Sequence, residues 1–423
     1  MISILLYNIG IRCYYFGISV ASYFSKKADS WIVGRVKIFS RMNMFMLSAH
    51  GKRIWFHCAS LGEFEQVRPL IEKIRQEHPK HILVLTFFSP SGFEAKRYYD
   101  GVDFVSYLPM DNRSEVRRFI RIMKPSLVIW VKYEFWYNVL DELKSKGIPV
   151  VLISSIFRPD QIFFRWYGGL HRRMLGFFSH IFVQNDASQQ LLQTIGVASE
   201  ICPDTRFDTV YGNMSKHKEW ASVAAFKGDK KIFIAGSTWP KDIDIMCDMI
   251  NNNALGEEFK YIIAPHDVSQ QNLTYILKKI KGRKKVLFSR LTSQQADKYE
   301  VVIVDTIGKL SSLYYYGDIA YIGGGFGRSI HNILEPIVYG MPVIFGPRHQ
   351  KSDEANTLLK HPDWHAAYTV KNSAELLSVM QSLLANEAQD LKTGSAKTKA
   401  YVESHTGGTE RIYSYLSGEG LLD

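Results

Sequence analysis

The chain has 423 residues, of which 46% are hydrophobic and 22% charged, a mixture that excludes a disordered protein and suits two folded domains. Its four cysteines, Cys13, Cys58, Cys202 and Cys247, lie far apart and form no CxxC pair, which argues against a zinc site and a disulfide framework. The formal net charge is +11.

This positive charge is concentrated at the amino terminus. Eight Lys and Arg residues precede Glu63 against one acidic residue, Asp29, so +7 of the +11 falls in the first 62 residues. Such a block suits an anionic membrane surface or a phosphorylated ligand. A nucleic-acid groove is the competing interpretation, but the sequence has no helix-turn-helix, zinc-finger or RNP-like pattern, so no nucleic-acid partner is expected.

An apolar, aromatic run covers residues 1–24, interrupted by Asn8 and Arg12 and followed by Lys26 and Lys27. No basic residue precedes the run, which is not the arrangement of a cleaved signal peptide. Its length is close to the roughly 20 residues that span a bilayer, but Arg12 makes a full span costly. We expect an uncleaved anchor that lies in, or dips into, the cytoplasmic leaflet. A helix packed on the protein's own core is the alternative.

Residues 31–47 mix Trp, Phe and Met with Arg and Lys, which is typical of an amphipathic surface for lipid. Together with the apolar run, this segment forms a predicted N-terminal region over residues 1–48.

From residue 54 onward, short apolar runs alternate with helical stretches, and the pattern restarts after a polar stretch at about 209–229. The runs have the composition of parallel strands covered on both faces. They lie at 54–59, 82–88, 103–108, 126–131, 150–155 and 180–184, then at 231–237, 260–265, 285–289, 300–305, 318–324 and 342–346.

Two such series predict an α/β protein with two Rossmann-like, doubly wound parallel sheets facing a cleft, the GT-B layout. The expected domains are 49–210 and 211–423, with the last helix returning to the first domain. The cleft is the default ligand site.

The first motif, Ser60-Leu61-Gly62-Glu63, directly follows the first predicted strand. Glycine there allows a ligand to approach the backbone, and a carboxylate at the carboxyl end of a parallel strand faces the cleft. Because S-x-x-E is also the capping box, a purely structural role for Ser60 and Glu63 is the alternative.

The second motif, at residues 132–138, places Glu134 between aromatic residues after the fourth predicted strand. A carboxylate in that position is a candidate for a perturbed pKa in the cleft. The alternative is a surface loop with Trp136 packed beneath it.

The third motif runs from Gly323 to Pro336 and contains four glycines followed by HNILEP. A strand, a glycine loop and a helix in this order predict a phosphate cradle made of backbone N–H groups and a helix N-terminus. The pattern is not GxGxxG, so a dinucleotide fold is not implied. Glu335, expected one turn into the helix, would accept hydrogen bonds from ribose hydroxyls. A tight structural turn is the alternative.

Further segments follow strands of the second series and are expected to line the carboxyl edge of one sheet, which is a nucleotide site by position. They are Gly236-Ser237-Thr238, Ala264-Pro265-His266, residues 305–309 and residues 346–349.

In this order, the segments resemble the transferases of 3-deoxy-D-manno-octulosonic acid (Kdo) in lipopolysaccharide synthesis, a GT-B family. The similarity runs from the N-terminal anchor to about residue 410, and HNxLEP behind a glycine loop is its most specific element. The segments are SLGE, YLPMD (107–111), EFWYN, RFD (206–208), GST, APH, DTIGKL and HNILEP.

The resemblance implies transfer of Kdo from CMP-Kdo to the lipid A precursor lipid IVA at the cytoplasmic face of the Gram-negative inner membrane. Glu63 matches the family's catalytic base, Glu134 a second acidic residue that assists in the transition state, and Arg206 stands where lysine is usual. The predicted donor-binding residues, from position or from this match, are Ser237, Thr238, Pro265, His266, Ile307, Gly308, Lys309, Gly324, Gly325, His331, Asn332, Ile333, Leu334 and Glu335.

The chain also departs from the family pattern. It lacks the usual Arg between Pro265 and His266, Lys132 replaces a usual Glu, and Tyr137 replaces a usual Pro. Arg206 keeps the positive charge of the usual lysine but presents it on a planar fork. These departures leave the phosphate contacts open.

The expected chemistry is an inverting transfer in which a carboxylate takes the proton of the acceptor hydroxyl. The glycine loop and Arg206 or Lys309 would stabilise the departing CMP. No histidine cluster suggests a metal, so the transfer is expected to be independent of metal ions. The expected partners are CMP-Kdo, lipid IVA and an anionic membrane surface, with no separate cofactor and no obligate protein partner.

Two rival functions share the fold. One is another GT-B nucleotide-sugar enzyme, a UDP-sugar transferase or epimerase, and the other is a non-catalytic membrane-bound protein. Thermal stabilisation by CMP, by UDP or by neither nucleotide would separate the three functions.

Overall fold

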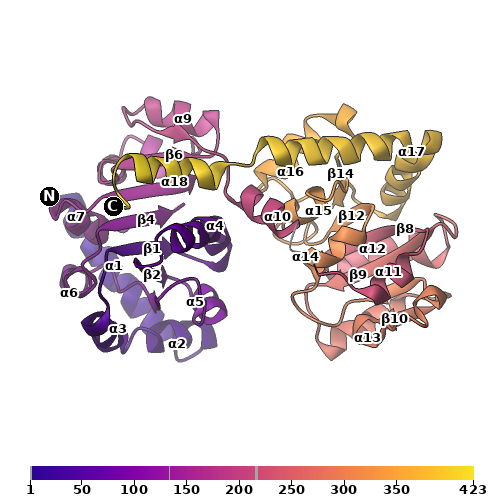
Figure 1. Cartoon of the computed structure of the whole chain (residues 1–423), viewed down its shortest axis with the longest axis horizontal. Helices are drawn as coiled ribbons and strands as arrows, with labels where there is room; N and C mark the ends of the chain where they lie inside the picture. Colours follow the sequence, from indigo (N-terminus) through magenta and orange to yellow (C-terminus); the bar gives the residue numbers. More distant parts are fainter. Residues whose placement is uncertain (1, 133, 215–217) are drawn as a thin grey trace. The chain divides into compact units, whose positions relative to one another are not determined.

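The computed structural model describes residues 2–132, 134–214 and 218–423, and the chain forms two compact units (Figure 1). The first unit combines the chain up to Thr209 with Thr406–Asp423, and the second is Val210–His405.

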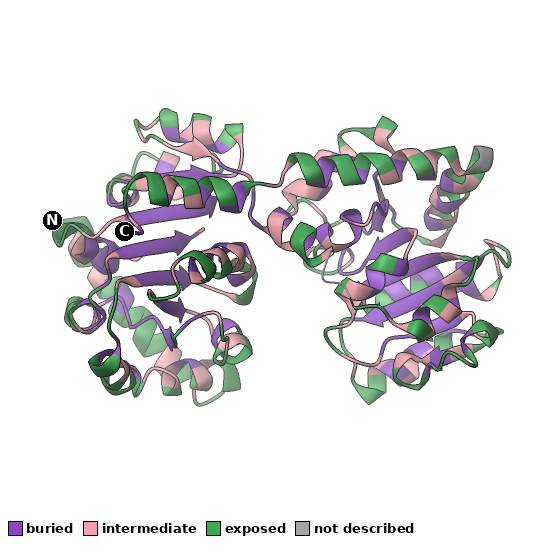
Figure 2. Cartoon of the chain, viewed as in Figure 1, coloured by how far each residue is buried: buried purple, intermediate pink, exposed green. Residues whose placement is uncertain are grey.

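The first unit is built on a seven-stranded parallel sheet in the order β3-β2-β1-β4-β5-β6-β7. Its strands are β1 (Arg53–Cys58), β2 (Ile82–Phe87), β3 (Phe104–Tyr107), β4 (Leu127–Val131), β5 (Val150–Ser155), β6 (His180–Val183) and β7 (Glu200–Ile201). Alternate residues of β1 enter different cores, since Trp55 belongs to one and Ile54 and Phe56 to the other. The central strands are therefore buried on both faces, which explains why their sequences are apolar throughout (Figure 2).

Helices connect these strands as crossovers, which parallel neighbours require. They are α4 (Leu61–Glu77), α5 (Pro90–Lys96), α6 (Arg113–Met123), α7 (Tyr137–Ser145), α8 (Gly169–Leu175) and α9 (Asp186–Gln193). Helix α10 (Arg206–Met214) then runs across the boundary between the two units.

Three helices precede the first sheet: α1 (Ile2–Ala21), α2 (Lys26–Val33) and α3 (Ile38–Ser48). Among the described residues, α1 is the one helix long and apolar enough to cross a membrane, judged by length and composition alone. One of its faces contacts the first unit through Tyr7 and Ile11. The other face is solvent-exposed and includes Leu5, Leu6 and Phe16.

The segment after α1 also packs on its own protein. Trp31 is buried, and the Arg35 guanidinium lies 3.6 Å from the centre of its ring. Arg35 donates to the carbonyl oxygens of Leu108 and Phe88, and burial lowers its pKa to about 9. This arginine of the basic N-terminal block is thus committed to internal contacts.

The second unit holds a second seven-stranded parallel sheet, in the order β10-β11-β9-β8-β12-β13-β14. Its strands are β8 (Lys231–Thr238), β9 (Phe259–Pro265), β10 (Lys285–Leu287), β11 (Val301–Ile303), β12 (Ile319–Ile322), β13 (Val343–Phe345) and β14 (Ala367–Thr369). Its helices are α11 (Ala221–Lys227), α12 (Pro240–Asn251), α13 (Gln270–Lys279), α14 (Leu310–Leu313), α15 (Leu334–Ile337), α16 (Asp353–Leu359) and α17 (Ser373–Ser404). Two doubly wound parallel sheets confirm the predicted α/β, GT-B-like fold class.

The chain ends with α18 (Gly408–Gly418), which belongs to the first unit. Ile412 and Leu416 on this helix are wholly buried in the core that also contains Phe56. The Asp208 carboxylate accepts 2.6 Å hydrogen bonds from the backbone N–H groups of Gly407 and Thr409. Asp208 of the RFD segment therefore fixes the start of this helix.

Candidate functional site

Glu63 lies in the first turn of α4, directly after β1. Its carboxylate accepts hydrogen bonds from the backbone N–H groups of Ala59 and Ser60. The Ser60 hydroxyl makes no cap hydrogen bond of its own. The capping box is thus half-formed, and Glu63 contributes the half that is present.

The Glu63 pKa is raised to about 7, chiefly by burial. The backbone hydrogen bond from Ala59 and the charge of Lys132 oppose this rise, while the nearby charge of Glu134 adds to it. A carboxyl group with a pKa close to 7 can exchange a proton at neutral pH, as a general base must.

Glu134 follows β4, and its side chain is 16% exposed. Its Oε2 lies 2.8 Å from His57 Nε2 and accepts a 3.0 Å hydrogen bond from Trp136 Nε1. Its backbone oxygen accepts from Trp130 Nε1 at 2.5 Å. Trp136 packs on Phe88 with ring centroids 4.8 Å apart, so this segment is both packed and close enough to Glu63 to influence its charge. Tyr133 of the same motif lies outside the described residues.

His57 is a residue of this site that sequence reasoning missed. It is wholly buried on β1, and its Nδ1 lies 2.9 Å from Thr86 Oγ1 on β2. His57 could have been predicted from its polarity, because His57 and Thr86 are polar residues within the otherwise apolar runs at 54–59 and 82–88. A buried polar side chain requires a hydrogen-bond partner, and here the partners are each other and Glu134.

Arg206 forms an ion pair with a second missed residue, Asp204. Arg206 Nη2 lies 2.8 Å from Asp204 Oδ2, which also accepts from Gln66 and Gln184. Burial alone would raise the Asp204 pKa, but the charge and hydrogen bonds of Arg206 outweigh it and lower the pKa. The Arg206 guanidinium, which we expected to stabilise the departing phosphate, is therefore already partly neutralised by Asp204 within the first unit.

On the second unit, a cavity of about 520 Å³ opens where the strand order reverses between β8 and β12, the usual ligand position in a doubly wound sheet. Of the predicted donor-binding residues, Gly324 and His331 line it. Phe326, Gly327, Arg328 and Ser329 of the Gly323–Pro336 motif also line it. The lining residues not singled out from sequence are Trp239, Pro240, Lys241 and Asp242.

Ser237 and Thr238 end β8 beside this cavity. Ser237 has a left-handed backbone with φ of 52°, a strained conformation that is concentrated at functional sites. The buried Thr238 hydroxyl has no hydrogen-bond partner within the described part of the protein. This hydroxyl is therefore an unsatisfied buried polar group at the end of β8.

His266 and His331 come together with Trp239 in one aromatic stack. The centroid of His266 is 4.6 Å from that of Trp239 and 4.7 Å from that of His331. Burial lowers the His331 pKa, and the neighbouring His266 charge lowers it further. The neutral His331 ring accepts a 3.2 Å hydrogen bond from Trp239 Nε1 at Nε2.

The glycine loop makes hydrogen bonds and close backbone contacts within the protein, where a phosphate cradle would leave backbone N–H groups free for a ligand. The Gly324 N–H donates to the buried Asp242 carboxylate, and Gly324 has a φ of 95° that only glycine tolerates easily. A Cβ on Gly325 would lie 2.6 Å from the Gly346 backbone, so these loops touch main chain to main chain. The structural turn, which was the alternative to the predicted phosphate cradle, is thus present, and the Gly324 N–H is already bonded to Asp242.

The HNILEP segment differs from prediction in one detail. Helix α15 begins at Leu334 and has four residues, so Glu335 lies in its first turn and not one turn further along the helix, as expected from sequence. A helix this short has too small a dipole to bind an anion at its N-terminus. The Asn332 side chain, two residues before this helix, accepts from the Leu334 N–H and donates to Glu335 at 3.4 Å. Ile333 and Leu334 are buried and pack this segment.

The remaining predicted donor contacts lie at neighbouring strand ends. Pro265 ends β9, and Ile307, Gly308 and Lys309 follow β11, where Ile307 is 83% exposed. None of the four lines the cavity between β8 and β12. Within the described residues, no group of three or more His, Cys, Asp or Glu side chains is arranged to hold a metal ion.

Comparisons with known proteins find similarity to 3-deoxy-D-manno-octulosonic acid transferases. Residues 35–209 match a family model described as 3-deoxy-D-manno-octulosonic-acid transferase (kdotransferase). A 3-deoxy-D-manno-octulosonic acid transferase from Chlamydia trachomatis is 26% identical over 93% of this chain and 91% of its own length. The enzyme of that name from Aquifex aeolicus is 29% identical over 78% of this chain and 86% of its own.

One solved structure is similar in fold alone. A UDP-GlcNAc 2-epimerase from Neisseria meningitidis, bound to UDP-GlcNAc, aligns with a TM-score of 0.58 at 12% identity. The alignment covers 83% of this chain and 99% of the epimerase.

Proposed function

Since this chain belongs to the Kdo transferase family of glycosyltransferases, we propose that it transfers Kdo from CMP-Kdo to lipid IVA, with inversion and without a metal ion. The observation that carries the proposal is Glu63, a half-buried carboxyl group at the carboxyl end of β1 whose pKa is raised to about 7.

In the proposed reaction, Glu63 takes the proton of the acceptor hydroxyl while the hydroxyl oxygen attacks the anomeric carbon of Kdo. The bond from that carbon to the CMP phosphate oxygen breaks, and CMP leaves with the electron pair. Attack opposite the leaving group inverts the anomeric centre. The charge of Glu134, fixed by His57 and Trp136, favours the positive charge that develops on the sugar.

The donor is proposed to bind at the carboxyl edge of the second sheet. The Thr238 hydroxyl is buried and has no hydrogen-bond partner among the described residues, and the His266 and His331 rings stack beside the cavity. Lys309 and Glu335 are the proposed contacts to phosphate and ribose, respectively. Arg206 keeps a smaller role than the sequence suggested, because Asp204 already pairs with it.

The acceptor is a glycolipid, so the enzyme is proposed to work at the cytoplasmic face of the inner membrane. The exposed apolar face of α1 and the exposed Met44 and Leu47 of α3 would enter the lipid interface. Lys26 and Lys27, which follow α1 closely in sequence, would meet anionic headgroups there.

The test is to incubate detergent-purified protein with a coupled source of CMP-Kdo, lipid IVA and EDTA, and to weigh the lipid by mass spectrometry. We expect a gain of one or more Kdo masses that Glu63→Ala and Glu63→Gln abolish. Glu72→Gln, a change at an exposed position of the same helix, is the matched control and should leave transfer intact.

Two results would contradict the proposal. A folded Glu63→Gln variant with near-normal turnover would remove Glu63 as the base. No mass gain with intact CMP-Kdo and folded wild type, combined with thermal stabilisation by UDP but not by CMP, would indicate another nucleotide-sugar substrate.

A further inference from the structure

His57 is a buried histidine that bridges two strands and the Glu134 segment. It lies on β1, its Nδ1 is 2.9 Å from Thr86 Oγ1, and its Nε2 is 2.8 Å from Glu134 Oε2. Both ring nitrogens are therefore committed, one toward the sheet and one toward the site.

The hydrogen bonds around Thr86 determine which nitrogen carries the proton. Trp55 Nε1 is 2.8 Å from Thr86 Oγ1, and because an indole N–H only donates, Thr86 accepts this bond. The single hydroxyl proton of Thr86 then has two acceptors within reach, His57 Nδ1 at 2.9 Å and the Phe56 carbonyl oxygen at 3.4 Å. The shorter contact favours His57, so Nδ1 accepts and Nε2 holds the proton.

With this tautomer, Glu134 Oε2 receives two N–H donors, from His57 and from Trp136 at 3.0 Å. An acceptor of two N–H bonds is favoured as the ionised carboxylate. The His57 ring also lies 4.3 Å from the ring of Trp130, which donates to the Glu134 backbone oxygen. Two strand residues, His57 on β1 and Trp130 on β4, thus hold the side chain and the main chain of Glu134, respectively.

We propose that His57 is a positioning residue that, as the neutral Nε2–H tautomer, holds the Glu134 carboxylate ionised and oriented beside Glu63. This inference rests on the proposed function and adds a hydrogen-bond relay from Trp55 through Thr86 and His57 to Glu134. His57 acts only through Glu134 and does not touch substrate.

The kinetic test is a double-mutant cycle with mass-spectrometric transfer assays on the full chain. His57→Ala should lower kcat about 100-fold, because a misplaced charge in the site costs that order of rate, while KM for donor and acceptor stays within about threefold. His57→Gln, whose amide N–H can still donate to Glu134, should recover most of the lost kcat. In a Glu134→Ala background, His57→Ala should cause no further loss.

The second readout does not depend on turnover. In an NMR spectrum of protein with ¹⁵N-labelled histidines, the His57 ring should show a protonated Nε2 and an unprotonated Nδ1. The His57 signal is assigned as the one that is missing from the spectrum of His57→Gln. Glu134→Ala should broaden or shift that signal. His171→Gln, a change at a half-buried histidine elsewhere in the unit, is the control and should alter neither kcat nor the His57 signal.

Three outcomes would overturn the inference. One is an Nδ1–H tautomer, and another is a His57→Ala loss of equal size in both backgrounds. The third is a folded His57→Gln variant as inactive as His57→Ala. If wild type transfers no Kdo while His57 shows the expected tautomer and its dependence on Glu134, the proposed function fails and the positioning contact stands.

Discussion

At the residue scale, Glu63 shows why a capping motif and a catalytic motif are hard to tell apart. Its carboxylate bonds the backbone of Ala59 and Ser60 at the start of α4, as a capping residue does. Burial nevertheless raises its pKa to about 7, which a solvent-exposed cap would not experience. Glu63 therefore has the hydrogen bonds of a cap together with the raised pKa that a general base would need, and its burial separates it from an ordinary exposed cap.

This burial predicts a pH-dependent stability. The folded-state pKa of Glu63, about 7, lies above the ordinary value of 4.5, so the folded protein binds this proton more tightly than the unfolded chain. Protonation of Glu63 therefore adds to the free energy of unfolding. This stabilisation is fully present below pH 4.5, is lost as the pH rises to about 7, and amounts to at most about 3 kcal/mol. We expect Glu63→Gln to lack this loss in urea denaturation compared between pH 5 and pH 8.

The matched control is again Glu72→Gln, which removes an exposed carboxylate paired with Arg68. It should follow the wild-type pH dependence. Parallel pH profiles for wild type and Glu63→Gln would contradict the buried-carboxyl account.

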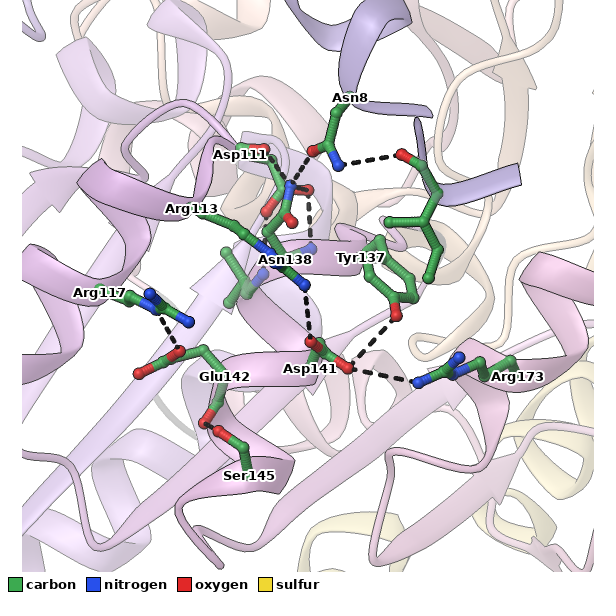
Figure 3. A network of polar contacts seen from close by, with 12 residues as sticks. Asn8, Asp111, Arg113, Arg117, Tyr137, Asn138, Asp141, Glu142, Ser145 and Arg173 are labelled. Carbon is green, nitrogen blue, oxygen red and sulfur yellow. Dashed lines mark hydrogen bonds and ion pairs between the residues drawn. The ribbon is translucent and has the colours of Figure 1, made fainter. Parts of the chain in front are cut away.

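At the element scale, a buried polar network fastens α1 to the first unit (Figure 3). Asp111 accepts a 2.6 Å hydrogen bond from the Tyr7 hydroxyl and further bonds from the backbone N–H groups of Asn138 and Val139. Asn8 Oδ1 accepts from the Asn138 side chain at 2.8 Å. Asn8, which interrupts the apolar run, thus faces the protein, and the YLPMD and EFWYN segments hold the helix in place.

We expect Asp111→Asn to release α1. The new amide N–H would face backbone donors, and burial leaves no water to compensate, which costs about 2–3 kcal/mol. Hydrogen–deuterium exchange over residues 2–21 should accelerate.

Asp141→Asn is the matched control for this release. It alters longer ion pairs to Arg113 and Arg173, at 3.9 and 3.8 Å, which stabilise by less than about 1 kcal/mol (Figure 3). Unchanged exchange of α1 in Asp111→Asn would show that apolar packing alone holds the helix.

Sequence reasoning located the central strands well, because burial on both faces forces apolar runs such as 126–131 and 150–155. It missed the edge strands β7 and β14, which are two and three residues long and partly exposed, so they leave no apolar run. It also missed His57 and Asp204, because their significance comes from partners distant in sequence: Glu134, 77 residues away from His57, and Gln66, 138 residues away from Asp204.

At the scale of the whole molecule, the first unit is completed by the carboxyl-terminal segment of the chain. Ile412 and Leu416 of α18 fill its core, and the Leu422 backbone oxygen lies 2.8 Å from His81 Nε2. The polypeptide therefore passes twice between the units, near residues 209 and 405.

Leu416→Ala should therefore destabilise the first unit rather than the second, by about 2–5 kcal/mol, since a wholly buried leucine leaves a cavity. Hydrogen–deuterium exchange of β1 should rise in this variant, while that of β8 stays as in wild type. Ser417→Ala, at the adjacent exposed position of the same helix, should change neither. Equal acceleration in both sheets would mean that the two units unfold as one.

The same closing helix constrains how the protein is made. Synthesis proceeds from the amino terminus, so the strands of the first sheet leave the ribosome long before α18 does. Until Ile412 and Leu416 emerge, the core around Phe56 has an uncovered apolar face, while the second unit, which is continuous in sequence, already has its whole chain available. The unit that carries Glu63 is therefore the last to reach its final structure, although its strands are synthesised first.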